Sequence, residues 1–78
     1  MDRARAAAAS QPGDEIEELD CVRLLGQLVS EGVTYPVGSI GTVVHKWRGG
    51  DDLEVEFSEP QPTVATLRTS DVEVVWRS

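Results

Sequence analysis

The feature that most constrains the fold is a glycine-framed, β-branched run at residues 38–44, Gly-Ser-Ile-Gly-Thr-Val-Val. It leads across a Gly-Gly-Asp-Asp segment into the alternating stretch 53–57, Leu-Glu-Val-Glu-Phe. Glycine readily adopts positive φ and aspartate bonds its own backbone, so residues 49–52 predict a hairpin turn. Gly41 allows a long strand to kink or coil where a small barrel turns its corner. The run therefore predicts a small, twisted, antiparallel structure.

Five short strands are expected, at residues 21–25, 40–48, 53–57, 63–67 and 72–76, with a 3₁₀-like turn over 68–71. Residues 26–37 form one long connection between the first two strands, and Leu28 and Val33 tuck it back over the barrel mouth. In the third strand, the apolar positions point inward and Glu54 and Glu56 point to water. The expected core consists of Val22, Leu24, Ile40, Val43, Val55, Phe57, Ala65, Leu67, Val72 and Val74.

One long first loop and tight later turns are typical of an all-β, five-stranded SH3-like barrel. An OB-fold is the rival, but roughly 65 residues without a middle helix fit it less well. The Ala-rich residues 1–14 predict a disordered N-terminal arm, and residues 15–78 the barrel domain. Residues 14–20 are an acidic lead-in that fits a short helix or an extended arm equally well.

The length of 78 residues allows one domain, and the single cysteine excludes an intrachain disulfide. The N-terminus does not match a secretory signal, and no apolar run approaches the length of a membrane span. We therefore expect a cytoplasmic protein. Unpaired edge strands allow self-pairing, which predicts a monomer or a weak homodimer.

The charge balance constrains the partner. Seven Lys and Arg stand against fourteen Asp and Glu, which gives a net charge of −7. Lys46 and Arg48, expected on the same face of one strand, form the only local basic group. Proteins that track phosphates need clustered cations, so nucleic acid is disfavoured. A basic protein partner is favoured over nucleic acid, because complementary charge accelerates the encounter of two molecules.

The sequence resembles a family of small bacterial SH3-like domains of unknown function. The resemblance rests on Leu-Asp-x-Val-x-Leu at 19–24 through Gly32, on residues 37–44 with Trp47, on Glu-Val-Glu-Phe at 54–57, and on Thr-Leu at 66–67. It covers about residues 19–75. The family pattern reads Gly-Asp-Val-Gly-Thr-Val-Val and Tyr-Glu-Val-Glu-Phe; here Ser39 replaces the usual Asp, and Leu53 stands where Tyr is common. The resemblance implies a fold and a bacterial origin but no activity.

The residues predict no catalytic or metal site and no cofactor. Cys21 and His45 are the only residues that could form a Cys–His pair of nucleophile and base, and nothing in the sequence places them together. Zinc wants four ligands, and this chain has one Cys and one His. The carboxylates at 15–20 and 51–56 follow neither the calcium-loop spacing nor a cleft pattern, so we expect a solvated surface. The protein is therefore expected not to be an enzyme.

The aromatic residues and the two cations beside Trp47 are the better candidates for partner binding. The expected site consists of Tyr35, Lys46, Trp47, Arg48 and Trp76. A tryptophan flanked by two cations has the mixed character of an interface anchor. Two structural roles compete with this: Trp47 capping the open end of the barrel, and Trp76 covering its underside. A full SH3 peptide groove is not expected, because Tyr35 stands alone.

The favoured hypothesis is a non-enzymatic protein-interaction module that docks on a larger, basic protein. An accessory subunit and an antitoxin or immunity-type inhibitor are two versions of it. The alternative is a KOW-like nucleic-acid-binding barrel, which requires Lys46, Arg48 and Arg68 to converge.

Overall fold

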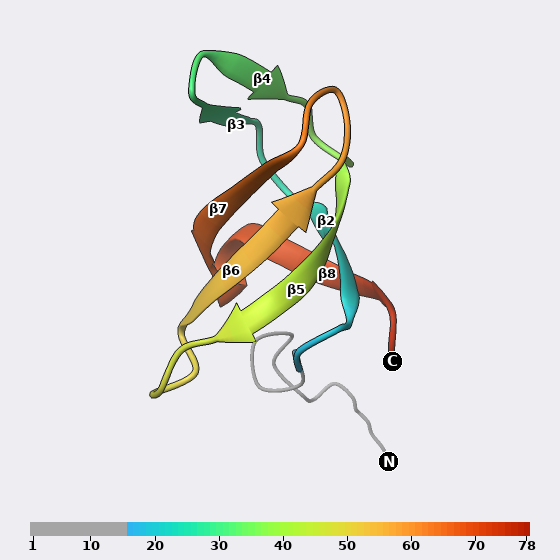
Figure 1. Ribbon diagram of the computed structural model, residues 1–78. Helices are drawn as coiled ribbons and strands as arrows, with labels where there is room; N and C mark the ends of the chain where they lie inside the picture. Colours follow the sequence, from blue (N-terminus) through green and yellow to red (C-terminus); the bar gives the residue numbers. More distant parts are fainter. Residues whose placement is uncertain (1–15) are drawn as a thin grey trace.

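The computed structural model describes residues 16–78 and shows an all-β fold (Figure 1). The predicted arm at 1–14 and residue 15 lie outside the described residues. The elements are β2 (Cys21–Leu24), β3 (Leu28–Ser30), β4 (Val33–Tyr35), β5 (Ile40–Lys46), β6 (Asp52–Phe57), β7 (Thr63–Arg68), the 3₁₀ turn η2 (Thr69–Asp71) and β8 (Val72–Trp76).

Five strands form one antiparallel sheet in the order β7-β6-β5-β2-β8, and β3 and β4 form a separate hairpin. Within residues 16–78, β7 and β8 are not paired with each other, so the sheet is curled but does not close into a hydrogen-bonded barrel. The all-β prediction is confirmed, whereas the closed barrel is not.

Two register shifts and one glycine help the sheet to curl. The pairing shifts after Val43 on β5 and after Cys21 on β2, and such bulges increase local twist. Between these strands Gly41 faces the core so closely that a Cβ there would lie 2.7 Å from Val55 Cγ1 and 2.9 Å from Phe57 Cε1. The sequence predicted that Gly41 lets the strand bend. The structure shows that Gly41 also lets β5 and β6 approach each other closely.

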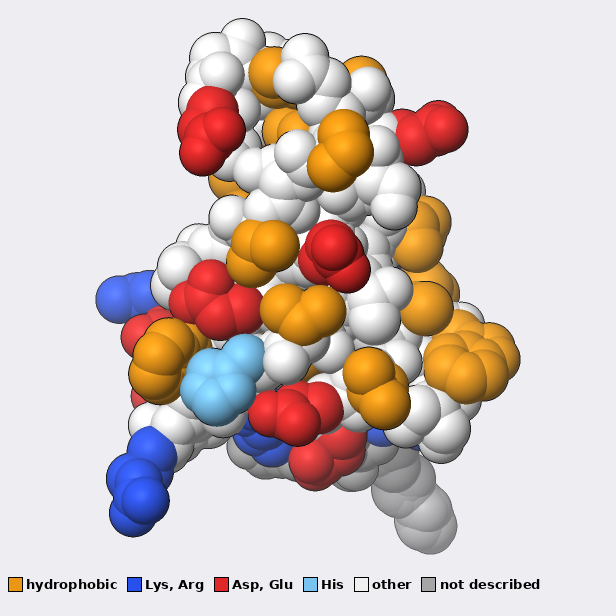
Figure 2. All heavy atoms as spheres, viewed as in Figure 1, with side chains coloured by type: hydrophobic (Ala, Val, Ile, Leu, Met, Phe, Trp, Pro, Cys, Tyr) orange, Lys and Arg blue, Asp and Glu red, His pale blue; other side chains and the backbone are white. Residues whose placement is uncertain are grey.

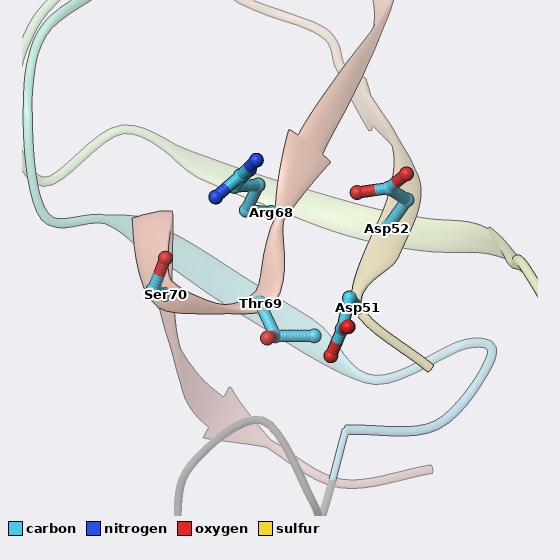
Figure 3. Close-up of a pocket in the computed structure, with 5 residues that line it drawn as sticks. All are labelled: Asp51, Asp52, Arg68, Thr69 and Ser70. Carbon is cyan, nitrogen blue, oxygen red and sulfur yellow. The ribbon is translucent and has the colours of Figure 1, made fainter. Parts of the chain in front are cut away.

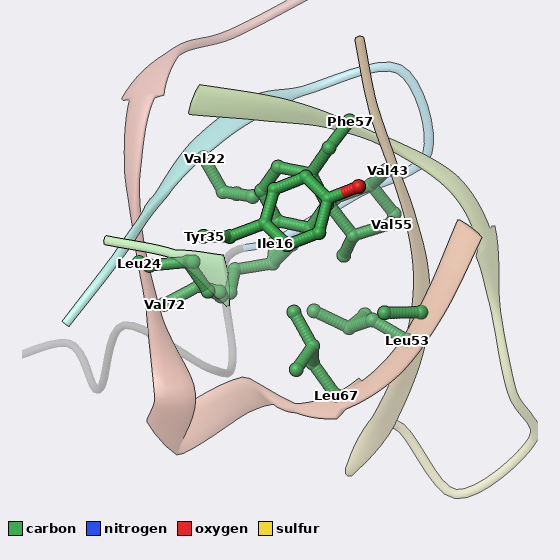
Figure 4. Close-up of a cluster of buried hydrophobic side chains, with 11 residues drawn as sticks. Ile16, Val22, Leu24, Tyr35, Val43, Leu53, Val55, Phe57, Leu67 and Val72 are labelled. Atoms are coloured by element: carbon green, nitrogen blue, oxygen red, sulfur yellow. The ribbon is translucent and has the colours of Figure 1, made fainter. Parts of the chain in front are cut away.

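The core lies on the concave face of the sheet (Figure 4). It consists of Ile16, Val22, Leu24, Tyr35, Val43, Leu53, Val55, Phe57, Ala65, Leu67 and Val72, with Leu28, Val33 and Val74 packed against it. The alternation predicted for β6 is confirmed, because its three apolar side chains are fully buried. Ile40 was expected in this core, which is wrong: it is 54% exposed. Residues 40 and 43 are an odd number of positions apart, so a regular strand places them on opposite faces.

The β3–β4 hairpin closes one end of the core, where the sequence predicted only a connection. Leu28 and Val33 pack against the core, as expected for this segment. Tyr35 is 1% exposed and its ring lies 5.5 Å from that of Phe57. Its hydroxyl donates a hydrogen bond to the Gln61 carbonyl at 2.7 Å, which ties the hairpin to the β6–β7 turn.

The opposite end of the core is closed by a turn at residues 17–20, where Ile16 is fully buried. Asp20 is also buried, and its carboxylate accepts backbone N–H bonds from Glu17 and Ser78, each at 3.0 Å. Burial raises the pKa of this carboxyl, but the two N–H bonds and the nearby Arg77 and Lys46 charges outweigh it and leave the pKa below its ordinary value. A carboxylate therefore joins the start and the end of the described chain.

Replacing Gly41 by alanine should destabilise the protein by about 1–3 kcal/mol, because the new methyl group meets buried backbone and side-chain atoms. Gly26→Ala is the matched control, since nothing lies within 4 Å of a Cβ there; it should be neutral or slightly stabilising. Urea unfolding of the three proteins measures both effects. Equal stability of the two variants would contradict the close packing at Gly41.

Asp20→Asn should cost about 1–3 kcal/mol at pH 7, because an amide cannot accept both N–H bonds as a carboxylate does. The folded pKa of Asp20 lies below its ordinary value of 3.8, so its contribution is present above that pH and is lost as the pH falls through the folded pKa. The variant should therefore lose less stability on acidification than the wild type. Asp51→Asn, on an exposed turn, controls for the loss of one negative charge. Identical acid unfolding of Asp20→Asn and wild type would contradict this role.

Candidate functional site

The candidate site is built around Trp47, at the end of β5. Glycines of positive φ at 49 and 50 turn the chain there, and the Trp47 N–H bonds to the Asp52 carbonyl at 2.9 Å. The indole N–H donates to Glu54 Oε2 at 2.7 Å, and the hydroxyl of Thr66 donates to the same oxygen at 2.8 Å. Trp47 remains 49% exposed. An exposed aromatic ring is thus held in one orientation by its neighbours.

His45 extends this cluster toward the N-terminal turn. Its ring meets the Trp47 ring edge-on, with 4.4 Å between the centroids. Its Nδ1 lies 3.4 Å from Glu18 Oε2. The pKa of Glu54 lies below its ordinary value because its carboxylate accepts two hydrogen bonds, of which the one from Trp47 has the larger effect and the one from Thr66 the smaller. Glu54 therefore carries its negative charge beside the indole at neutral pH.

The two cations that flank Trp47 do not share a strand face, so that expectation is wrong. β5 ends at Lys46, and Arg48 lies in the exposed turn that follows. The Lys46 ammonium lies 3.6 Å from Glu17 Oε2, and its backbone N–H donates to Glu18 Oε2 at 3.3 Å. Arg48 alone therefore extends from the turn beside Trp47.

The other two predicted aromatics lie elsewhere. Tyr35 is buried in the core, so its ring presents no surface to a partner. Trp76, at the end of β8 and opposite Cys21, is 59% exposed. The structure therefore brings Lys46, Trp47 and Arg48 together, leaves Trp76 on a separate strand, and places Tyr35 in the core. Sequence reasoning missed Glu54 and Thr66 as the residues that orient Trp47, because the register that sets them opposite each other on β6 and β7 cannot be derived from either strand alone.

A polar hollow of about 430 Å³ lies next to this cluster, where β6 begins and β7 ends (Figure 3). It is lined by Asp51, Asp52, Arg68, Thr69 and Ser70. Two carboxylates and one guanidinium share it, so it matches neither a phosphate nor a lone cation. It forms a mixed-charge rim beside the Trp47 turn.

In the part of the chain that the structure describes, the fold does not bring Cys21 and His45 together. Cys21 lies opposite Thr42 and Trp76, whereas His45 faces Glu18 and Trp47. Within residues 16–78, no three His, Cys, Asp or Glu side chains are grouped to hold a metal ion. Nor does the described part of the chain contain a helix with the length and hydropathy needed to cross a membrane.

Comparisons with known proteins found no matching family model, no matching curated protein and no matching solved structure. The resemblance to bacterial SH3-like domains of unknown function therefore stays a prediction. The geometry of the chain itself carries the functional argument.

Glu54→Ala should release the Trp47 indole, because its carboxylate is the acceptor of the indole N–H. The Trp47 indole resonance in a ¹H–¹⁵N spectrum should move upfield and exchange faster with water. In the wild type that resonance should hold its position as the pH falls through 4.5 and move only at lower pH, since the pKa of Glu54 lies below that ordinary value. Glu56→Ala, on the same strand, is the control and should leave the resonance in place. An unchanged indole signal in Glu54→Ala would contradict the orienting role.

Proposed function

We propose that this protein is a non-enzymatic protein-interaction module: an acidic, SH3-like domain that docks on a larger, basic protein partner. An accessory subunit of a complex and an antitoxin-type inhibitor are both forms of this function. The SH3-like assignment is supported by the strand order, by the hairpin between the first and second sheet strands, and by the 3₁₀ turn before the last strand.

The oriented ring of Trp47 is the observation that carries the proposal. Interface anchors are enriched in tryptophan and arginine, and an anchor already fixed in its bound orientation loses little entropy on binding. Trp47 is half exposed yet is held by Glu54 and contacts His45. Among residues 16–78, the core and the partly buried side chains packed against it do not include Trp47. Arg48 and the mixed-charge hollow supply a polar rim around it.

The charge distribution favours a basic protein over nucleic acid. The net charge is −7, and two of the three cations that a nucleic-acid site would require lie among carboxylates. Lys46 is paired with Glu17, and Arg68 shares its hollow with Asp51 and Asp52. Such a surface repels a phosphate backbone and attracts a basic protein surface. For these reasons the KOW-like alternative ranks second.

Affinity capture of the tagged protein from cells of the organism that encodes it, followed by mass spectrometry, tests the proposal. We expect one dominant, stoichiometric protein. Trp47→Ala should weaken its binding about thirtyfold, the equivalent of ~2 kcal/mol at an interface anchor. Leu25→Ala, which removes a side chain of similar exposure elsewhere, is the matched control and should bind normally. Circular dichroism checks that both variants fold. Capture of nucleic acid alone, or of nothing, would contradict the proposed function.

A further inference from the structure

The convex face of the sheet carries apolar side chains that the core does not use. A row of directly opposed residues crosses all five strands, in the order Val64, Glu56, Thr42, Cys21 and Trp76. Opposed residues point to the same side of a sheet, and this side faces away from the core. Figure 2 shows hydrophobic side chains spread over the molecular face in view, with acidic side chains between them.

The centre of this row has small side chains, whereas its two ends and the neighbouring outward positions on β5 are apolar. Thr42 and Cys21 are half-buried, whereas Val64 and Trp76 at the two ends are 53% and 59% exposed. Ile40 and Val44, two positions to either side of Thr42 on β5, are 54% and 41% exposed. We call the set Leu19, Ile40, Val44, Val64 and Trp76 the outer-face patch. Clustered exposed apolar residues of this kind mark interaction surfaces.

Leu19 adds an independent observation. It adopts a φ of 76° in the turn closed by the Asp20 N–H to Glu17 carbonyl bond, a conformation that favours glycine. Its N–H bonds to the Val43 carbonyl, which places it beside Val44, yet its side chain is 62% exposed. A leucine here carries both backbone strain and apolar exposure, and neither stabilises the fold. Such violations of local rules are characteristic of functional positions.

The charges around the patch indicate which charge a binding partner carries. Glu56 lies within the row and, among residues 16–78, its exposed carboxylate has no hydrogen-bond or ion-pair partner. Glu17 and Glu18, which precede Leu19, are exposed, but Glu17 lies beside the Lys46 ammonium and Glu18 beside His45. Arg23, which lies opposite Ile40, is neutralised by Glu73, with Nε 2.7 Å from Oε1. Arg77, which follows Trp76, has its Nη1 3.6 Å from Asp20 Oδ2. The patch is therefore apolar with an uncompensated negative charge.

We infer that the outer-face patch docks a basic amphipathic segment of another protein, one that presents apolar side chains for the patch and a Lys or Arg for Glu56. The inference rests on the interaction-module function proposed above and adds a second surface to Trp47. A second copy of the chain is disfavoured because two acidic faces would meet, and an anionic lipid or nucleic-acid surface is disfavoured for the same reason.

The test uses the full chain, ¹⁵N-labelled, with three synthetic peptides of equal length: an amphipathic helix of Leu and Lys, the same helix with Glu for Lys, and a peptide of Lys alone. We expect the Leu/Lys peptide to shift the resonances of the outer-face patch, including the Trp76 indole. It should bind at least tenfold more tightly than the Lys peptide, and its affinity should fall with salt. The Leu/Glu peptide should not bind.

Ile40→Lys should weaken binding of the Leu/Lys peptide at least tenfold. Val29 has a similar exposure on β3, and the Val29→Lys variant should bind this peptide as the wild type does. Thermal unfolding checks that both variants keep their fold. Equal binding of the Leu/Glu peptide, or the absence of any shift on the patch, would overturn the inference. Shifts confined to Trp47 would overturn it while leaving the proposed function intact. A wild-type dimer that Ile40→Lys dissociates in sedimentation would overturn it in favour of a second copy.

Discussion

A single curled sheet has to cover its own apolar face, because residues 16–78 contain no α-helix that could pack on it. Each strand contributes alternate side chains to the concave side, and the two open ends of the curl need separate covers. Tyr35 closes one end from the β3–β4 hairpin, and Ile16 closes the other from the N-terminal turn. Gly41 lets the strands approach closely enough for the core to be continuous. The rest of the structure depends on these three positions.

The same constraint explains why two aromatic residues have opposite roles. Tyr35 presents an apolar ring to Phe57 and keeps a hydroxyl that reaches the Gln61 carbonyl, so it is buried with its polar group satisfied. Trp47 also has its polar group satisfied, by Glu54, but at the surface. Its hydrogen bond therefore orients a ring that water still reaches. This difference, invisible in a list of aromatic residues, separates a core residue from a candidate anchor.

Period-two alternation predicted most of the sheet from the sequence. β8 begins and ends where expected, and the inward face of β6 is as predicted. The β3–β4 hairpin escaped notice because its strands have three residues each and its turn places Glu31, a residue that rarely adopts positive φ, at 52°. Ile40 was misplaced because Gly41 occupies the inward position without a side chain to mark it. The same alternation, extended two residues before Val22, places Asp20 on the buried side of the sheet.

The candidate site was less predictable, because it depends on contacts between strands. The sequence identifies Trp47 and its flanking cations, but only the register of β6 against its neighbours brings Glu54 opposite both His45 and Thr66. The register likewise gathers the outer-face patch from residues far apart in the chain.

The two faces of the sheet differ in what a substitution there can change. On the concave face, a lost methyl group leaves a cavity and lowers stability. On the convex face, the apolar side chains are already half in water, so their replacement by a charged residue alters little of the free energy of unfolding. Under the proposed docking role, Ile40, Val64 and Trp76 serve contact with another molecule more than the stability of the fold. With Glu56 uncompensated among them, the electrostatic term opposes a copy of the chain and favours a basic segment.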